Sequence, residues 1–218
     1  MRYPLSSSPD GWYRVFDGVD FALYPGERVG IVGRNGVGKS TLLRLMARIF
    51  APSHGSVVWA PNTSVSLLSL GLGFRSDLTG RENALLSCLL LGHSKKAARD
   101  CLPGIEAFSE LGPFFDQPVK TYSSGMRARL GFGTALLNRS AVILIDEILG
   151  VGDAAFRAKA REALNQQLSE ERSVVLVSHA DAQIKSLCDR VIWLDAGGIE
   201  MSDDPQSVLD AYNAVKGP

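Results

Sequence analysis

Runs of consecutive apolar residues mark the parts of this chain that are most deeply buried. Ala141 to Glu147 reads Ala-Val-Ile-Leu-Ile-Asp-Glu, and Ser173 to His179 reads Ser-Val-Val-Leu-Val-Ser-His. Runs that are apolar on both faces are typical of parallel strands covered on both sides of a sheet. The stretch between them, Ala154 to Leu168, has helical spacing. The pattern therefore predicts a strand–helix–strand unit with two parallel strands.

The middle of the chain has a different pattern. From Leu78 to Phe115 the apolar residues recur mostly at helical spacing. Thr79 is the predicted N-cap of the first helix, and Glu82, three residues on, completes the sequence of a capping box. We therefore expect a helical insertion between two halves of a sheet.

Shorter elements are predicted elsewhere. Tyr13 to Tyr24 alternates loosely and ends at the turn signal Pro25-Gly26, which predicts antiparallel strands leading into the core. Two strand patterns near the C-terminus meet at Gly197-Gly198 and predict a hairpin. The remaining predicted elements are strands at Val57 to Trp59 and Val65 to Leu70, the hairpin strands Arg190 to Leu194 and Ile199-Glu200, and a helix from Asp204 to Val215.

A glycine-rich stretch follows the strand pattern at Glu27 to Val32 and precedes a helical pattern at Leu42 to Phe50. It matches G-x-x-x-x-G-K-[ST], the phosphate-binding loop. Its glycines let backbone N–H groups wrap around phosphates, and the helix dipole favours the same anion. Lys39 is expected to reach the β- and γ-phosphates and Ser40 to bind Mg²⁺. The predicted nucleotide-binding residues are Gly33, Arg34, Asn35, Gly36, Val37, Gly38, Lys39, Ser40 and Thr41.

Charged and polar residues end the two long apolar runs. Ligands of open α/β sheets bind at the carboxyl ends of parallel strands. Asp146 would hold Mg²⁺ through water beside Ser40, and Glu147 would polarise a water that attacks the γ-phosphate. His179 would donate to the γ-phosphate or orient that water. A helix-capping Asp and an ordinary strand-end His are the alternatives for these positions.

A second stretch with anion-binding character is Tyr122 to Phe132. Ser123, Ser124 and Gly125 offer hydroxyls and backbone N–H groups at the expected N-terminus of a helix. An ordinary helix cap uses the same residue types. The residues by themselves do not separate these two interpretations.

Composition argues against some functions. The 218 residues contain 23 Lys+Arg and 23 Asp+Glu, so the net charge is zero and gives no field for nucleic acid; we predict no nucleic-acid partner. The three cysteines have no metal-ligand spacing and suggest a reducing compartment. No signal region or bilayer-length apolar run is present, so we predict no direct membrane insertion.

Taken together, these motifs resemble the nucleotide-binding subunit of an ABC transporter over nearly the whole chain. Gly33 to Thr41 resembles the Walker A motif, and Val142 to Asp146 resembles the Walker B motif. The resemblance places Glu147 as the catalytic glutamate and His179 as the switch histidine. Two further positions match, with Gly152-Asp153 in the D-loop and Tyr122 to Met126 at the signature motif.

That resemblance implies an α/β P-loop NTPase fold. A single nucleotide-binding domain over residues 1–218 would combine a RecA-like core, with a mixed, mainly parallel sheet and an antiparallel β subdomain, and an inserted α-helical subdomain. The core would comprise residues 1–70 and 139–218, and the helical subdomain residues 71–138. The expected ligands are ATP and Mg²⁺. The expected partners are a second copy, packed head to tail, and an integral-membrane permease.

Departures from the usual motifs narrow the family. Tyr-Ser-Ser-Gly-Met replaces Leu-Ser-Gly-Gly-Gln in the signature, and Ser69 to Phe74 lacks the usual Q-loop glutamine, which removes one expected Mg²⁺ contact. With Leu-Thr-Gly-Arg-Glu-Asn (Leu78 to Asn83), these features resemble exporters of capsule, O-antigen and teichoic acid. Since this sequence ends at Pro218, we expect it to be most similar to short capsule-type subunits. Such subunits work at the cytoplasmic face of the inner membrane, where Leu72 to Leu78 and Asp116 to Lys120 would meet the permease.

Two questions stay open at this level. The aromatic residue that stacks on adenine is Tyr3, or else Tyr13 or Trp12, and each of these could equally pack on the core. The alternative functions are a soluble ABC-type ATPase that does not transport, an ABC exporter subunit for a different cargo, and a nucleotide-binding regulatory module without turnover. Coiled-coil insertions or tandem cassettes, which are usual in the first class, are absent from this sequence.

Overall fold

The computed structural model describes residues 1–4, 11–68, 74–136, 140–146, 153–168, 172–195 and 197–216. Its contacts divide the chain into two compact units. Unit 1 comprises Met1–Thr63, Val142–Asp146 and Glu171–Pro218, and unit 2 comprises Ser64–Ala141 and Glu147–Glu170. The prediction of a helical subdomain at residues 71–138 stays a prediction.

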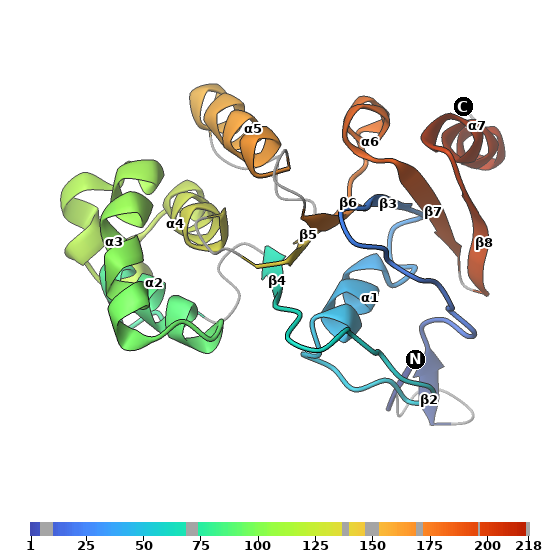
Figure 1. Cartoon of the computed structure of the whole chain (residues 1–218), viewed down its shortest axis with the longest axis horizontal. Helices are drawn as coiled ribbons and strands as arrows, with labels where there is room; N and C mark the ends of the chain where they lie inside the picture. Colours follow the sequence, from blue (N-terminus) through green and yellow to red (C-terminus); the bar gives the residue numbers. More distant parts are fainter. Residues whose placement is uncertain are drawn as a thin grey trace. The chain divides into compact units, whose positions relative to one another are not determined.

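Unit 1 contains most of the strands of a sheet (Figure 1). The four parallel strands β5 (Val142–Asp146), β6 (Ser173–Val177), β3 (Arg28–Val32) and β7 (Arg190–Asp195) lie side by side in that order, and β8 (Gly198–Asp203) pairs antiparallel with β7. All five residues of β6 are buried, as its unbroken apolar run predicts. The mixed, mainly parallel sheet and the C-terminal hairpin predicted from sequence are confirmed.

Three helices of unit 1 cover this part of the sheet. Helix α1 (Lys39–Met46) contacts β5 and β6 on one face, and α7 (Pro205–Lys216) contacts β3, β7 and β8 on the other, next to α6 (Asp181–Leu187) (Figure 1). Gly30 allows α6 to approach closely, since a Cβ there would lie 3.1 Å from Cδ1 of Ile184 and 3.2 Å from Sγ of Cys188. The sheet edge that carries the candidate site is therefore fixed from both faces.

The N-terminal strand predictions were partly wrong. The strand expected over Tyr13 to Tyr24 is limited to β2 (Trp12–Arg14), which pairs antiparallel with β1 (Arg2–Pro4). From Val15 onward the chain leaves the strand so that Val15 and Phe16 can pack, buried, beside Gly38. Val57 to Trp59 forms no strand, and the Trp59 indole instead donates to the carbonyl oxygen of Met46.

Unit 2 is mainly helical. Helices α2 (Gly80–Leu90), α3 (Lys95–Ser109) and α4 (Ser124–Leu136) pack on one another, and α5 (Ala154–Leu168) and β4 (Val65–Leu68) contact α4. The short 3₁₀ helices η1 (Gly112–Asp116) and η2 (Val119–Thr121) lead into α4. Residues 69 and 70 of the predicted Val65 to Leu70 strand lie outside the described residues.

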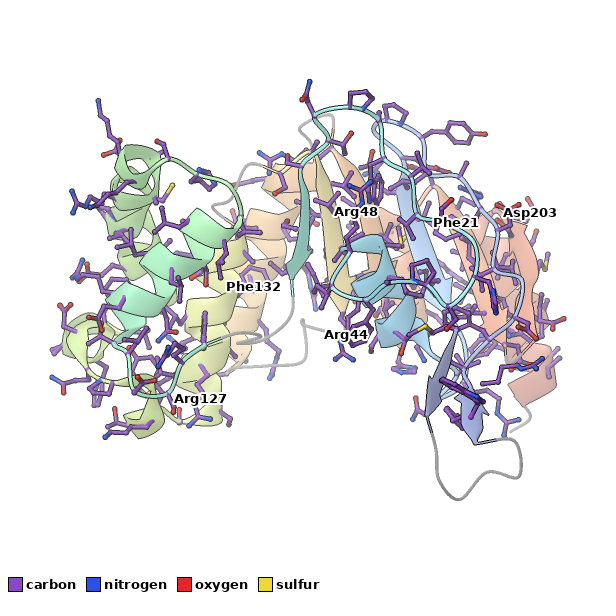
Figure 2. The ribbon with its side chains drawn as sticks, turned by 90° about the horizontal axis from the view of Figure 1, so that it is seen from below. Phe21, Arg44, Arg48, Arg127, Phe132 and Asp203 are labelled. Carbon is purple, nitrogen blue, oxygen red and sulfur yellow. The ribbon has the colours of Figure 1, made fainter. Side chains whose placement is uncertain are left out.

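The predicted capping box at the start of α2 is confirmed. The Thr79 hydroxyl accepts from the Glu82 N–H over 3.1 Å, and the Glu82 carboxylate accepts from the Thr79 N–H over 2.8 Å. Aromatic rings join α3, α4 and α5, because Phe132 (Figure 2) stacks on Phe108 at 5.7 Å and meets Phe156 edge-on at 6.1 Å. The signature-position helix α4 is thereby held on two sides within unit 2.

Candidate functional site: a phosphate-binding loop and a signature-position helix

The glycine-rich loop of unit 1 requires glycine at both of its ends. A Cβ on Gly33 would lie 2.3 Å from the Leu194 carbonyl oxygen, and a Cβ on Gly38 would lie 2.4 Å from Cγ1 of Val15. Between them Gly36 has a φ of 81°, and no atom of the described residues lies within 4 Å of a Cβ built there. The loop is therefore packed tightly at its ends and open at its tip, as a backbone cradle for an anion must be.

Lys39 projects into this loop. Its Nζ donates to the carbonyl oxygens of Gly33, over 2.8 Å, and Arg34, over 3.1 Å, and the residue is 8% exposed. A buried ammonium needs strong acceptors. The carbonyl oxygens supply them here, and phosphate oxygens would supply stronger ones.

Helix α1 begins directly at this lysine. Gly38 is its N-cap in the left-handed conformation, without a side-chain cap, and no acidic residue lies in its first turn. Leu42, Leu43 and Met46 are buried and hold the helix in place. Ser40 and Thr41, half-buried in the first turn, lie where the helix dipole favours an anion.

Strand register brings the other unit 1 residues to the same edge of the sheet. Val177 of β6 is paired with Ile31 of β3 on one side and with Asp146 of β5 on the other. Gly33 lies two residues beyond Ile31, and His179 two residues beyond Val177, so the loop, Asp146 and His179 all follow the carboxyl ends of neighbouring parallel strands.

The turn that carries His179 is fixed by its neighbour. The Ser178 hydroxyl donates to Oε1 of Gln183 over 2.7 Å and accepts from the Ala180 N–H over 3.1 Å. Ser178 is buried, whereas His179 is exposed at the edge of the sheet. A short hydrogen-bonded turn therefore presents the imidazole to solvent on a rigid base.

Other predicted residues of this site are described only in part. Glu147, the predicted water-activating residue, lies outside the described residues, as do residues 69–73, which belong to the stretch that lacks the usual Q-loop glutamine. Tyr3 lies in β1, where its backbone pairs with Tyr13 of β2; its side chain is not among those described. Trp12 and Tyr13 are 40% and 50% exposed, so the choice of adenine-stacking residue stays open.

In unit 2, the predicted residues Ser123, Ser124 and Gly125 lie together at the start of α4. The Ser123 hydroxyl accepts from the Met126 N–H over 3.2 Å, which is the geometry of an N-cap. Gly125 has room for a side chain, since the nearest atom to a Cβ there is Ser123 Oγ at 3.8 Å. Internal packing therefore does not explain the glycine.

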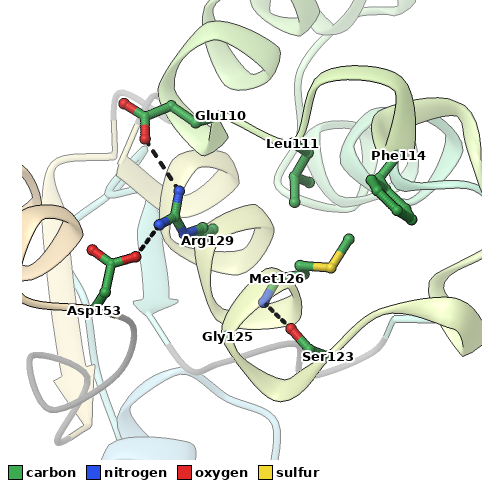
Figure 3. A pocket seen from close by; sticks show the side chains of 8 residues that line it. All are labelled: Glu110, Leu111, Phe114, Ser123, Gly125, Met126, Arg129 and Asp153. Atoms are coloured by element: carbon green, nitrogen blue, oxygen red, sulfur yellow. Dashed lines mark hydrogen bonds and ion pairs between the residues drawn. The ribbon is translucent and has the colours of Figure 1, made fainter.

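A pocket of about 350 Å³ lies next to this helix start (Figure 3). Along one side of it, the Arg129 guanidinium pairs with the carboxylates of Glu110, at 3.1 Å, and Asp153. The Phe156 N–H and Arg129 hold the pKa of Asp153 below its usual value, and Lys159 lowers that of Glu110. The pocket is lined by Glu110, Leu111, Phe114, Ser123, Gly125, Met126, Arg129 and Asp153.

Sequence reasoning assigned no role to Arg129. It is one of two arginines in Met-Arg-Ala-Arg-Leu, and nothing in the sequence separates it from Arg127. In the structure Arg127, labelled in Figure 2, is exposed, whereas Arg129 lies over the Phe156 ring at 4.8 Å and joins the signature-position helix to Asp153 at the start of α5.

These residues fit the phosphates of a nucleotide. The open glycine tip, the helix N-terminus and the buried ammonium of Lys39 all favour an anion. A metal fits only as a companion to those phosphates, because the described residues contain no group of three or more His, Cys, Asp or Glu that could hold one alone. The residues that would hold Mg²⁺ are Ser40 and Asp146, together with phosphate oxygens and water.

Solved structures identify the fold. A dimeric ATP-binding cassette in a post-hydrolysis state, bound to ADP and Pi, superposes with a TM-score of 0.77 over 94% of this chain and 95% of its own, at 20% identity. A structure of the ATP binding subunit of an ABC transporter gives a TM-score of 0.79 over 100% and 94%, also at 20% identity. The fold is that of an ATP-binding cassette.

Sequence comparison identifies the family. Residues 16–150 match the family model described as ABC transporter, and the chain belongs to that family. Similar relatives include the O-antigen export system ATP-binding protein RfbB of Klebsiella pneumoniae, 38% identical over 92% of this chain and 81% of its own length. The teichoic acids export ATP-binding protein TagH of Shouchella clausii is 34% identical over 97% of this chain, and that of Enterococcus faecalis 41% over 94%.

The chain spans only part of several of these relatives. It covers 58% of the length of the Shouchella protein and 45% of the Enterococcus protein. Among the helices described, none is both long and apolar enough to cross a bilayer.

Proposed function

We propose that this chain binds and hydrolyses MgATP, and that it powers export of a cell-surface polysaccharide through an integral-membrane permease. It would act as one of two identical subunits, packed head to tail, at the cytoplasmic face of the inner membrane. The observation that carries the proposal is the phosphate cradle of unit 1, where the backbone from Gly33 to Gly38 and the buried Lys39 ammonium surround an open tip.

Each predicted site residue would have its own role in ATP hydrolysis. Lys39 would exchange its two carbonyl acceptors for phosphate oxygens, and the N–H groups at the start of α1 would hold the same phosphates. Mg²⁺, when bound by Ser40 and Asp146, would supply positive charge to the phosphates. Glu147 would accept a proton from the attacking water, and His179 would orient that water or donate to the terminal phosphate.

Ser123, Ser124 and Gly125 would complete the site in trans, on the nucleotide held by the other subunit. Gly125 supports this assignment, because no atom among the described residues requires a glycine there. A glycine retained without an internal reason favours close approach of a ligand to the backbone. The dimeric cassettes with the same fold support a two-subunit arrangement.

The cargo is proposed from the relatives and from motifs shared with their family. TagH and RfbB are named for export of teichoic acids and of O-antigen, respectively. No described residue is assigned to sugar binding, because the motor subunit need not touch the polymer.

Cell-surface glycan tests this proposal in the cell that encodes the chain. We expect Glu147→Gln, which is nearly isosteric, to retain ATP binding while long-chain glycan disappears from the surface and accumulates inside. Glu162→Gln, an exposed glutamate on α5, is the matched control and should export normally. Unchanged surface glycan with stably expressed Glu147→Gln would exclude the polysaccharide assignment. If the purified complex of this chain with its permease hydrolysed no ATP, the proposed enzymatic activity would be excluded.

A further inference from the structure

Two segments of unit 2 are joined by backbone hydrogen bonds just before the signature motif. The first is the lead-in to α2, residues 75–80, which we call the lead-in segment. The Lys120 N–H donates to the Ser76 carbonyl and the Val119 N–H to the Leu78 carbonyl, both over 2.9 Å. The Gly80 N–H donates to the Gln117 carbonyl over 3.2 Å. The lead-in segment and residues 114–122 therefore form one hydrogen-bonded body.

The side chains of Asn83 and Arg81 add to these backbone contacts. The Asn83 carboxamide, 1% exposed, accepts from the Arg75 N–H and donates to the carbonyl oxygens of Arg75, Leu78 and Thr79. Arg81 pairs with Asp116 at 2.6 Å and covers the Phe115 ring at 4.7 Å. A buried amide with every polar atom satisfied rigidifies its surroundings.

The outer edge of this body is open to solvent. Arg75, Ser76 and Asp77 of the lead-in segment are exposed, as are Gln117 and Lys120 opposite them. A partner that binds this edge would contact backbone that is hydrogen-bonded to the residues preceding Ser123.

Tyr122 connects this body to the signature motif. Its hydroxyl donates to the Phe114 carbonyl over 2.6 Å, and the residue is 4% exposed. The hydroxyl occupies the space that a side chain on Gly80 would need, since a Cβ there would lie 2.2 Å from Oη. Its backbone N–H donates to the Val119 carbonyl over 3.0 Å, and the next residue is Ser123, the cap of α4.

We infer that Tyr122 is a positioning residue, whose hydroxyl ties the signature serine to the lead-in segment so that movement of one is passed to the other. This inference rests on the proposed function. It also accounts for two departures of the sequence together, because a tyrosine stands where the usual signature has leucine, and its hydroxyl packs against Gly80, in the segment that follows the missing Q-loop glutamine.

Steady-state ATP hydrolysis by the permease complex tests this role with Tyr122→Phe, which removes only the hydroxyl. We expect kcat to fall on the order of five-fold, the value of one lost hydrogen bond. The KM for ATP should change less than two-fold, since the P-loop is untouched. Tyr24→Phe, at a tyrosine 64% exposed in unit 1, is the matched control and should retain the wild-type kcat. Rates are compared per folded molecule, with the unfolding midpoint of each variant measured.

A second pair of variants tests the contact itself. Gly80→Ala places a methyl group 2.2 Å from the Tyr122 hydroxyl and 2.9 Å from the Phe115 carbonyl oxygen, and should also lower kcat. In Gly80→Ala/Tyr122→Phe the nearer of these two atoms is absent, so the combined loss should be smaller than the product of the single losses. Losses that multiply, or a Tyr122→Phe complex with wild-type kcat, would overturn the inference while leaving the proposed function intact. A wild-type complex without ATP hydrolysis would instead overturn the proposed function, and the inference with it.

Discussion

The Lys39 ammonium donates to the carbonyl oxygen of Gly33 over 2.8 Å, so the lysine closes the loop that it is expected to share with a nucleotide. The residue is 8% exposed, so most of this side chain is removed from bulk water. The two carbonyl acceptors hold the ammonium within the loop.

Lys39→Ala should therefore weaken ATP binding by at least about ten-fold, a loss typical of one buried charge-assisted contact. Titration with a fluorescent ATP analogue measures this. Lys185→Ala, at an exposed lysine on α6, should bind as the wild type does. Equal affinities for the Lys39 variant and the wild type would show that the nucleotide does not use this ammonium.

Gly36 and Gly38 lie in the same loop with left-handed backbone, but their surroundings differ. A Cβ on Gly38 would lie 2.4 Å from Val15, whereas one on Gly36 would have no neighbour within 4 Å in the part of the chain that the structure describes. Gly36→Ala should cost about 1 kcal/mol of unfolding free energy through backbone strain alone. Gly38→Ala should cost at least about 2 kcal/mol more, because Val15 and Phe16 must shift. Urea unfolding compares the two, and equal costs would contradict the packing described at Gly38.

The pair between Glu110 and Lys159 makes stability depend on pH. The Lys159 ammonium, 2.6 Å from Glu110, lowers the pKa of that carboxyl below its usual 4.5. Because the folded-state pKa is depressed, the pair's contribution to the free energy of unfolding is fully present above pH 4.5. This contribution is lost as the pH falls through the lower, folded-state pKa. Glu110→Gln should thus be less stable than the wild type at neutral pH, by under about 1 kcal/mol because solvent screens the pair.

That difference should shrink at acid pH, since protonated Glu110 resembles glutamine. Urea unfolding of both proteins at neutral pH and at about pH 3 measures it, with Glu162→Gln as the exposed control on α5. A difference that stays constant with pH would mean that Glu110 acts through packing rather than charge.

Thiol reactivity should separate the three cysteines. Burial raises the pKa of Cys88 to about 11 and that of Cys188 to about 12, while Cys101 is half-buried. Because the thiolate is the reactive form, a disulfide reagent at about pH 8 should modify Cys101 quickly and Cys88 and Cys188 slowly. Cys101→Ser should remove the fast phase, and denatured protein should react at all three. A fast phase that survives in Cys101→Ser would show that a buried thiol is accessible.

The fold was predictable wherever one local signal decided the structure. The capping box at Thr79 and Glu82 depends on residues three apart, and the apolar run of β6 must be buried on both faces, so both were read correctly. Val57 to Trp59 looked like a strand but is not one, because Trp59 bonds to the end of α1 instead. Tertiary contacts decided that element, and a local pattern does not contain them.

The candidate site was likewise predictable only where a local sequence pattern decides the structure. Phosphate binding needs glycine and lysine at fixed spacing, so the loop could be read from the sequence. The contact between Gly80 and Tyr122 joins residues more than forty positions apart, and Arg129 was indistinguishable from Arg127 until Glu110 and Asp153 were placed around it.

The empty space beside Gly125 has a consequence for how this protein can vary. Alanine fits there without a clash and is the better helix former, by up to about 1 kcal/mol. Selection for a stable fold alone would therefore replace this glycine, whereas the proposed role in trans would retain it. On that proposal, Gly125 is a position where stability and activity oppose each other. Variants chosen for heat resistance would be drawn toward alanine there and, on the same proposal, would lose ATP hydrolysis.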